Sequence, residues 1–243
     1  MSLFVIGDTH LSFGVQKPMD IFAGWENHTE LLRDAWCRLI RPEDTVVLAG
    51  DISWGMNMEE ALPDFQWLDA LPGKEKIILK GNHDYWWVTM KKMCDFFAAH
   101  QLSTLKILHN NCYAYGEYGI CGTRGWVNME PDSAAPDDEK VSAREAQRLA
   151  VSLNAAEQQG LKPIAFLHYP PIYGCSCNYP MLEVLWQHPV TDCWYGHVHG
   201  RSQHRYAVNG ERDGICYHLI AGDYVQFIPQ KVVGYRQLHL AGR

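Results

Sequence analysis

The sequence predicts an α/β fold with a largely parallel sheet, followed by a second or mixed sheet. Three observations support this prediction: short apolar runs that end in glycine or a polar turn, helical patterns between the early runs, and a strand-rich C-terminal part. At 243 residues, the chain suffices for one large domain or two small ones, and we expect a single domain over residues 1–243.

Eight short apolar runs are the strand candidates. Each is five to ten residues long and ends in a glycine or a polar turn, as strands bounded by loops do. They cover residues 3–7, 45–50, 76–81, 118–123, 163–168, 193–197, 215–222 and 231–240.

Helical patterns lie between the early strands. Residues 28–40 carry an apolar stripe at helical spacing that stops just before Pro42, and residues 86–98 carry a similar stripe. Residues 57–71 are also typical of a helix, and we expect Pro63 to kink or split it.

An acidic, turn-rich stretch at 127–140 leads into an amphipathic helix at about 141–158. This excursion, at about 127–160, stands between two predicted strands. It is either a surface excursion or a lid or substrate wall, and the sequence leaves both interpretations open.

The composition limits the classes of function. The formal net charge is −7 and no block rich in Lys or Arg occurs, so a nucleic-acid partner is disfavoured. The sequence starts directly in a strand-like run without the features of a signal peptide, and no apolar stretch approaches the ~18 residues of a membrane span. We expect a cytoplasmic, soluble protein with no membrane partner.

Polar clusters follow five of the predicted segments, at residues 7–10, 50–54, 81–84, 168–171 and 196–200. Ligands of open α/β sheets bind outside the carboxyl ends of the strands, so these clusters can converge on one site. Each cluster alone is a weak signal. The prediction of a site rests on all five clusters occurring together, each at the end of a predicted strand.

The residue types in these clusters favour a site for transition-metal ions. They supply carboxylate, imidazole and amide groups without thiolates, unlike a structural zinc site built from cysteines. Seven such ligands are too many for one tetrahedral ion but enough for two ions, ~3.5–4 Å apart, that share a carboxylate. The predicted ligands are Asp8, His10, Asp51, Asn82, His168, His197 and His199.

With these blocks the chain resembles the calcineurin-like metallophosphoesterases, whose signature runs D-x-H, G-D-x-x, G-N-H-[D/E], a later H, and G-H-x-H. The matching text is "DTH" at 8–10, "GDIS" at 50–53, "GNHD" at 81–84, His168 in "LHYPP", and "GHVH" at 196–199. The matched blocks span about 190 residues. The resemblance implies a four-layer αββα sandwich with two mixed sheets and a dinuclear site at one sheet edge.

The resemblance also implies how the seven residues divide between two metals. Asp8, His10, Asp51 and His199 would hold one ion, and Asp51, Asn82, His168 and His197 the other, with Asp51 as the bridge. The ions would be divalent or transition metals such as Mn, Fe or Zn.

The same resemblance places His83 beside the metals without binding them, facing the leaving group or a phosphoryl oxygen. We therefore expect His83 and its neighbour Asp84 to be the catalytic pair of the block. Asp84 either orients His83 or a neighbouring loop, or caps a helix that begins near Trp86, and the sequence is compatible with both.

The expected activity is hydrolysis of a phosphomonoester or phosphodiester of a small molecule. A hydroxide that bridges two metal ions attacks phosphorus, and protonated His83 assists the leaving alkoxide. The sequence does not distinguish phosphatase from phosphodiesterase.

Two further residues are candidates for substrate binding. Arg124, in "GTRGW", is either a clamp for phosphoryl oxygens or a surface arginine that pairs with the acidic excursion. Tyr169 belongs to a set of aromatic residues near the predicted ligands that either form a wall for the substrate or pack in the core. The others are Tyr85, Trp86, Trp87, Trp126 and Tyr173.

Departures from relatives narrow the class of enzyme. Protein Ser/Thr phosphatases of this superfamily carry G-D-x-x-D-R-G and G-N-H-E, whereas this chain reads "GDISWGM" and "GNHD". A nuclease would bring a basic groove and a further domain. Two alternatives stay open: a nuclease acting on nucleic acid, which a basic strip assembled only in three dimensions would favour, and a non-catalytic metal-binding scaffold, against which the retained His83 argues.

Overall fold

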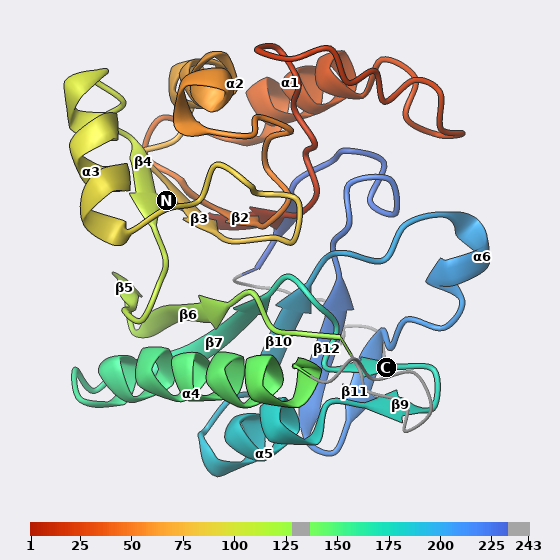
Figure 1. Cartoon of the computed structure of the whole chain (residues 1–243). Helices are drawn as coiled ribbons and strands as arrows, with labels where there is room; N and C mark the ends of the chain where they lie inside the picture. The colour runs from red at the N-terminus through yellow and green to blue at the C-terminus, as the bar shows by residue number, and fades with distance from the viewer. Residues whose placement is uncertain (128–136, 233–243) are drawn as a thin grey trace.

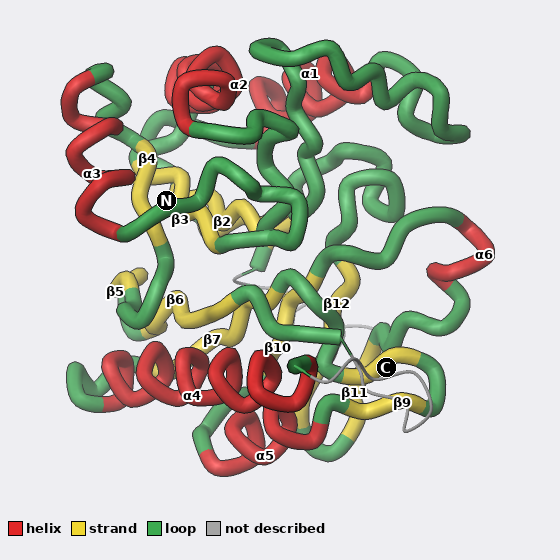
Figure 2. Tube along the Cα trace, in the orientation of Figure 1, coloured by secondary structure: helices red, strands yellow, loops and turns green. Residues whose placement is uncertain are grey.

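The computed structural model describes residues 1–127 and 137–232. Two β-sheets face each other in the middle of the molecule, and helices cover the outer face of each (Figure 1). The same layers appear in Figure 2, where the red helices lie outside the yellow strands. The predicted α/β class and the four-layer αββα arrangement are confirmed.

The first sheet has the strand order β13-β1-β2-β3-β4, in which β1 to β4 run parallel and β13 is antiparallel to β1. Helices α1, α2 and α3 cover its outer face. The strands are β1 (Leu3–Ile6), β2 (Thr45–Ala49), β3 (Glu75–Leu79), β4 (Leu105–Ile107) and β13 (Gln230–Lys231), and the helices are α1 (His28–Leu39), α2 (Met58–Ala70) and α3 (Met90–Ala99).

The second sheet has the order β11-β12-β10-β7-β6-β5, with four parallel strands at its centre and an antiparallel strand at each edge. Helices α4 (Asp138–Glu157) and α5 (Tyr179–Gln187) cover its outer face. The strands are β5 (Tyr113–Tyr115), β6 (Tyr118–Thr123), β7 (Lys162–Leu167), β10 (Asp192–Tyr195), β11 (Gly210–Arg212) and β12 (Ile215–Leu219). A short ribbon of β8 (Ile172–Tyr173) and β9 (Ser176–Cys177) and a one-turn helix α6 (Arg201–His204) complete the described elements.

The central strands are largely apolar because both faces of each sheet are covered. In β1, Leu3 and Val5 pack between the sheets, whereas Phe4 and Ile6 pack against the outer helices. The space between the sheets is filled in the same way by Val47 and other apolar side chains from both sheets. The C-terminal strand ends are thereby fixed relative to one another.

Most of the predicted elements are present, with ends shifted by one to three residues. The helix predicted at 86–98 is the main correction, because it begins at Met90, where Thr89 caps it by accepting a hydrogen bond from the Lys92 amide. Pro63 lies inside an unbroken α2, so the predicted split is wrong. Most of the strand predicted at 231–240 lies outside the described residues. Strands β4 and β5 and helix α5 were not predicted.

The predicted excursion at 127–160 divides into two parts. Its helical part is α4, which packs on β6, β7 and α5 with Leu149 and Leu153 fully buried, and is therefore a layer of the fold rather than a lid. Residues 128–136 lie outside the described part of the chain. No helix within 1–127 and 137–232 is both long and apolar enough to cross a bilayer.

Candidate metal centre

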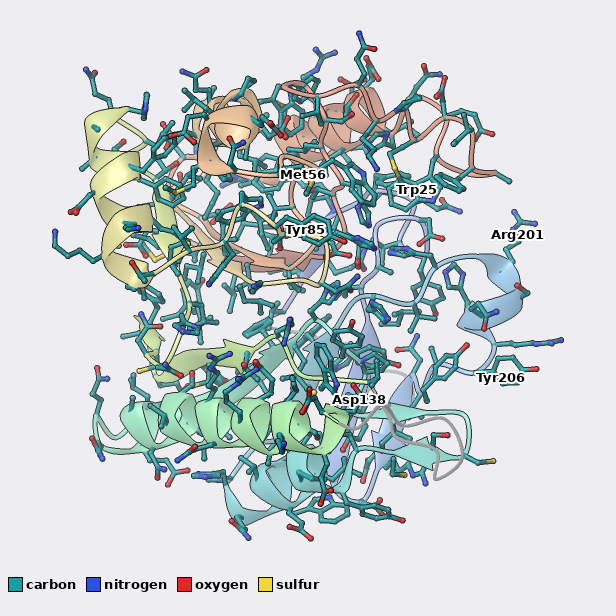
Figure 3. All side chains as sticks on the ribbon, in the orientation of Figure 1. Trp25, Met56, Tyr85, Asp138, Arg201 and Tyr206 are labelled. Carbon is teal, nitrogen blue, oxygen red and sulfur yellow. The ribbon has the colours of Figure 1, made fainter. Side chains whose placement is uncertain are left out.

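All seven predicted ligands meet at one edge of the two sheets. They lie in the loops after β1, β2 and β3 of the first sheet and after β7 and β10 of the second. Figure 3 shows Tyr85, from the loop after β3, and Asp138, at the start of α4, on opposite sides of this edge. Because the two sheets pack against each other, residues almost 190 positions apart in the sequence come into contact here. The His197 amide, for example, donates a hydrogen bond to Asp8 Oδ2 at 3.0 Å.

The first cluster consists of Asp8, His10 and His199, whose candidate ligand atoms lie within 4.8 Å of one another. His199 Nε2 is 3.2 Å from Asp8 Oδ1. The His10 ring is buried and stacks on Trp54 with a centroid distance of 4.9 Å, which fixes its orientation.

The second cluster consists of Asp51, His168 and His197, again within 4.8 Å. Asn82 joins it, because its Oδ1 lies 2.7 Å from His168 Nε2. His197 Nδ1 lies 3.3 Å from the same nitrogen. The carbonyl of Ala49, 3.1 Å from His168 Nδ1, holds the opposite side of that ring.

Asp51 stands between the two clusters. Its Oδ2 is 3.6 Å from His10 Nε2 in one cluster and 3.5 Å from His168 Nε2 in the other. This oxygen is buried and accepts no hydrogen bond from any described residue, whereas Oδ1 accepts one from the His83 amide at 2.7 Å. A buried carboxylate oxygen without a hydrogen-bond donor suits a cation, so these residues fit the binding of metal.

The electrostatics of three of the four imidazoles also fit metal binding. Burial lowers the pKa of His168 to about 3 and, together with His168, lowers that of His197 to about 3, while the pKa of His10 is also lowered by burial. These rings are therefore neutral near pH 7, which is the form that binds a metal. Burial and the neighbouring carboxylates Asp84 and Asp8 raise the pKa of Asp51.

Four of the predicted ligands adopt a left-handed backbone. The φ angles are 58° at Asp8, 41° at His10, 52° at Asp51 and 70° at His197. For a residue other than glycine, such a conformation costs roughly 1–3 kcal/mol. The loops thus hold these side chains in place at a cost in stability.

Two glycines of the signature blocks are needed for close packing. A Cβ at Gly81 would overlap Asp51 Oδ1, and a Cβ at Gly196 would overlap Asp8 Oδ2. Both carboxylates therefore lie directly against the bare backbone of the neighbouring loop.

Asp84 organises the loops that carry the site. It is fully buried, and its carboxylate accepts hydrogen bonds from the amides of Asp51 (2.9 Å), Ile52 (2.8 Å) and Gly81 (2.7 Å) and from the Trp86 indole (2.9 Å). Asp84 thus orients the neighbouring loops, which is one of its predicted roles, and its assignment as a catalytic residue stays a prediction. The alternative prediction, a cap for a helix beginning near Trp86, is wrong because α3 begins four residues later.

His83 lies beside both clusters. Its ring centroid is 4.6 Å from that of Trp54 and 5.7 Å from that of His10. Its Nδ1 is buried without a hydrogen-bond partner in the part of the chain that the structure describes. Burial lowers the pKa of the His83 ring.

Arg124 is not a surface arginine, but it does pair with the predicted excursion, and its role as a clamp for phosphoryl oxygens stays a prediction. Its side chain is only 16% exposed; its Nη2 lies 3.5 Å from Glu145 Oε1 of α4, and its guanidinium lies over the Trp126 ring at 4.4 Å. Its main-chain carbonyl accepts the amides of His168 and Tyr169. Arg124 is therefore tied to the loop that carries a predicted ligand.

Tyr169 lies directly against the second cluster. Its ring centroid is 4.1 Å from that of His197, and burial raises the pKa of its hydroxyl to about 12. It lines a pocket of about 500 Å³ together with Tyr173 and His199. Among the other predicted aromatic residues, Trp86 is buried in the core against Phe65, whereas Tyr85 is exposed.

The sequence analysis missed Asp223. Its Oδ1 lies 3.0 Å from His199 Nδ1, and its Oδ2 accepts the Gly200 amide at 2.8 Å. Burial alone would lower the pKa of His199, but Asp8 and Asp223 raise it to about 10. The signal was present, because "AGD" follows β12 just as "AGD" follows β2.

Comparisons with known proteins agree with this arrangement. The sequence model of the calcineurin-like phosphoesterases matches residues 1–201. No curated protein matches the chain. GAP50, the anchor in the inner membrane complex of Plasmodium, is a similar solved structure with 11% identity and a TM-score of 0.52 over 92% of this chain and 72% of that one.

A second similar structure is the protein of unknown function AQ665 from Aquifex aeolicus, with 16% identity and a TM-score of 0.48 over 99% of this chain and 98% of that one. At 11% identity, the likeness to the GAP50 structure is one of fold alone. The family match covers every signature block, from Asp8 to His199. The chain belongs to the calcineurin-like phosphoesterase family.

Proposed function

We propose that the chain is a dinuclear metal-dependent phosphoesterase that hydrolyses a phosphomonoester or phosphodiester of a small molecule. The observation that carries the proposal is the buried Oδ2 of Asp51, placed between His10 and His168 and without a hydrogen-bond partner among the described residues. A carboxylate in this position suits a bridge between two cations.

The two clusters supply the proposed ligand sets. Asp8, His10 and His199 would hold one ion and Asn82, His168 and His197 the other, with Asp51 shared between them. Mn, Fe or Zn would suit these oxygen and nitrogen donors. Two such ions would lower the pKa of water and offset the charge on the phosphoryl oxygens.

The other residues of the site position the ligands and handle the leaving group. Asp84 holds the amides of two ligand loops, and Asp223 orients His199 by a hydrogen bond to Nδ1. His83, whose Nδ1 has no partner within residues 1–127 and 137–232, would donate a proton or a hydrogen bond to the ester oxygen as it leaves.

The test combines metal analysis with hydrolysis of p-nitrophenyl phosphate and bis(p-nitrophenyl) phosphate, with Asp51→Asn as the control variant. The proposal expects about two metal ions per chain and ester cleavage that the variant loses. Full metal loading without cleavage of either ester would favour the scaffold alternative. Failure to bind metal after reconstitution would remove the basis of the proposal.

A further inference from the structure

A second pocket, of about 490 Å³, lies beside the metal centre. It opens at the C-terminal ends of β3, β4 and β6, the next strands along the edge that carries the proposed metal ligands. Lys80 on its wall stands two residues before Asn82, and the Arg124 carbonyl accepts the amide of His168. The pocket is therefore attached to two loops of the metal centre.

The pocket is cationic in a protein whose net charge is −7. Four cationic side chains line it, Lys80, Lys92, Arg124 and Arg148, whereas the only carboxylate among its lining residues is Glu145. Glu145 is buried and already accepts hydrogen bonds from Thr123 (2.6 Å) and Arg148 (2.5 Å). One carboxylate does not neutralise this group of cations.

Two of these cations have donors that nothing in the described chain satisfies. The Lys80 side chain is half-buried and has no hydrogen-bond or ion-pair partner within residues 1–127 and 137–232. The Arg124 Nε is buried and likewise lacks an acceptor in that part of the chain. Partly buried cationic donors without acceptors are destabilising unless a ligand supplies the missing oxygens.

We propose that this pocket binds a second phosphoryl group of the substrate, so that the enzyme acts on a small molecule with two phosphates. Lys80 supplies a point charge, and the guanidinium groups of Arg124 and Arg148 supply planar donors that match phosphate oxygens. The indole of Trp87 lines the same pocket. The assignment of the bound phosphate to a substrate rests on the proposed hydrolase function, whereas the anion site itself does not.

The first experiment measures binding without catalysis. Inorganic phosphate is titrated calorimetrically into the full chain carrying Asp51→Asn, dialysed against a chelator, so that no metal competes for it. Adding Lys80→Met should weaken phosphate binding by about tenfold, because a charged hydrogen bond to phosphate is lost. The matched control Lys91→Met removes an exposed cation of α3 that pairs with Asp95 outside the pocket, and binding should be unchanged.

Circular dichroism checks that each variant is folded, and Arg148→Met provides an independent variant from the opposite wall. The absence of saturable phosphate binding would overturn the proposal. Equal affinities for the Lys80→Met, Arg148→Met and Lys91→Met proteins would also overturn it.

The second experiment tests the substrate class on the metal-loaded chain. Fructose 1,6-bisphosphate should be cleaved with a kcat/KM at least about tenfold above that of fructose 6-phosphate, and Lys80→Met should abolish this preference. An unchanged ratio in the variant would overturn the substrate assignment. If neither ester is cleaved but the binding experiment gives the expected loss, the hydrolase proposal fails and the anion site stands.

Discussion

The two ends of the first sheet each bury an ionisable side chain, but they differ in whether that side chain has hydrogen-bond partners. At the N-terminal end of β3, the ammonium of Lys76 is fully buried and donates to the carbonyls of Asp69 (3.1 Å) and Leu71 (2.5 Å) and to Thr104 Oγ1 (3.1 Å). At the C-terminal end of β2, Asp51 is just as buried, yet its Oδ2 has no hydrogen-bond partner among the described residues.

This difference separates a structural charge from a functional one. A lysine has three donors, and all three are used at Lys76, so nothing further is needed there. The unpaired oxygen of Asp51 costs stability, and only a ligand that enters the site can recover it. The following four predictions test that distinction.

The largest effect is expected for Asp51→Asn. Loss of the shared ligand should reduce kcat/KM by roughly a thousandfold or more, since a metal ion supplies several kcal/mol of charge stabilisation and each 1.36 kcal/mol is tenfold. In excess chelator, the variant should unfold at a higher temperature than the wild type, because it avoids the cost of either burying the Asp51 carboxylate as a charge or protonating it on folding. A lower melting temperature of the metal-free variant would contradict the comparison.

His83→Gln should lower kcat by roughly 10²–10⁴-fold without changing the metal content, because it removes the proposed proton donor and no ligand. The measurement is steady-state turnover together with elemental analysis of the same sample. His100→Gln, at an exposed position after α3, is the matched control. Unchanged turnover in His83→Gln would show that its unpaired nitrogen has no catalytic role.

Asp223→Ala should weaken metal binding by roughly 10–100-fold, since it removes the hydrogen bond that orients His199. Competition with a fluorescent chelator measures the affinity. Asp213→Ala removes an exposed carboxylate near β12 and should leave the affinity as it is. Equal affinities of the two variants would mean that Asp223 does not support the site.

The smallest effect on activity is expected at the other end of the sheet. Lys76→Met should leave turnover unchanged and lower the free energy of unfolding by about 1–3 kcal/mol at pH 7, because acceptors of the lysine lose their donor. Chemical denaturation measures this change. A loss of turnover with normal metal content would contradict the assignment of Lys76 as purely structural.

The same variant gives a pH signature. Burial lowers the pKa of Lys76 from 10.5 to about 8. Between these values the unfolded chain binds more protons than the folded one, so Lys76 makes the free energy of unfolding rise with pH in that window. The difference between wild type and Lys76→Met should therefore grow from pH 8 to pH 10, and a constant difference would contradict the assigned pKa.

Much of the fold and the site could be predicted because the strongest signals are local. Apolar runs that end in "GD", "GNH" or "GH" mark both a buried strand and the polar group at its end, and parallel strands bring these ends together. The seven predicted ligands meet for this reason. The choice among the roles predicted for Asp84 could not be made from the sequence, because a sequence does not show which backbone amides surround a carboxylate.

Other parts of the molecule could not be predicted from local patterns. Trp86 fits an apolar stripe at helical spacing. Its indole instead donates a hydrogen bond to Asp84 and its ring packs on Phe65, and the helix begins only at Met90 because of these tertiary contacts. The cationic pocket was missed because Lys80, Arg124 and Arg148 come from three distant segments, and only the packing of α4 beside β6 brings them together.

The left-handed backbone at Asp8, His10, Asp51 and His197 has an evolutionary consequence. Glycine adopts this conformation without strain, so mutation to glycine at any of the four positions relieves the backbone while it destroys a proposed ligand. Such a variant should therefore be more stable than the wild type and unable to bind metal normally. At these four positions, selection for stability and selection for a metal ligand act in opposite directions.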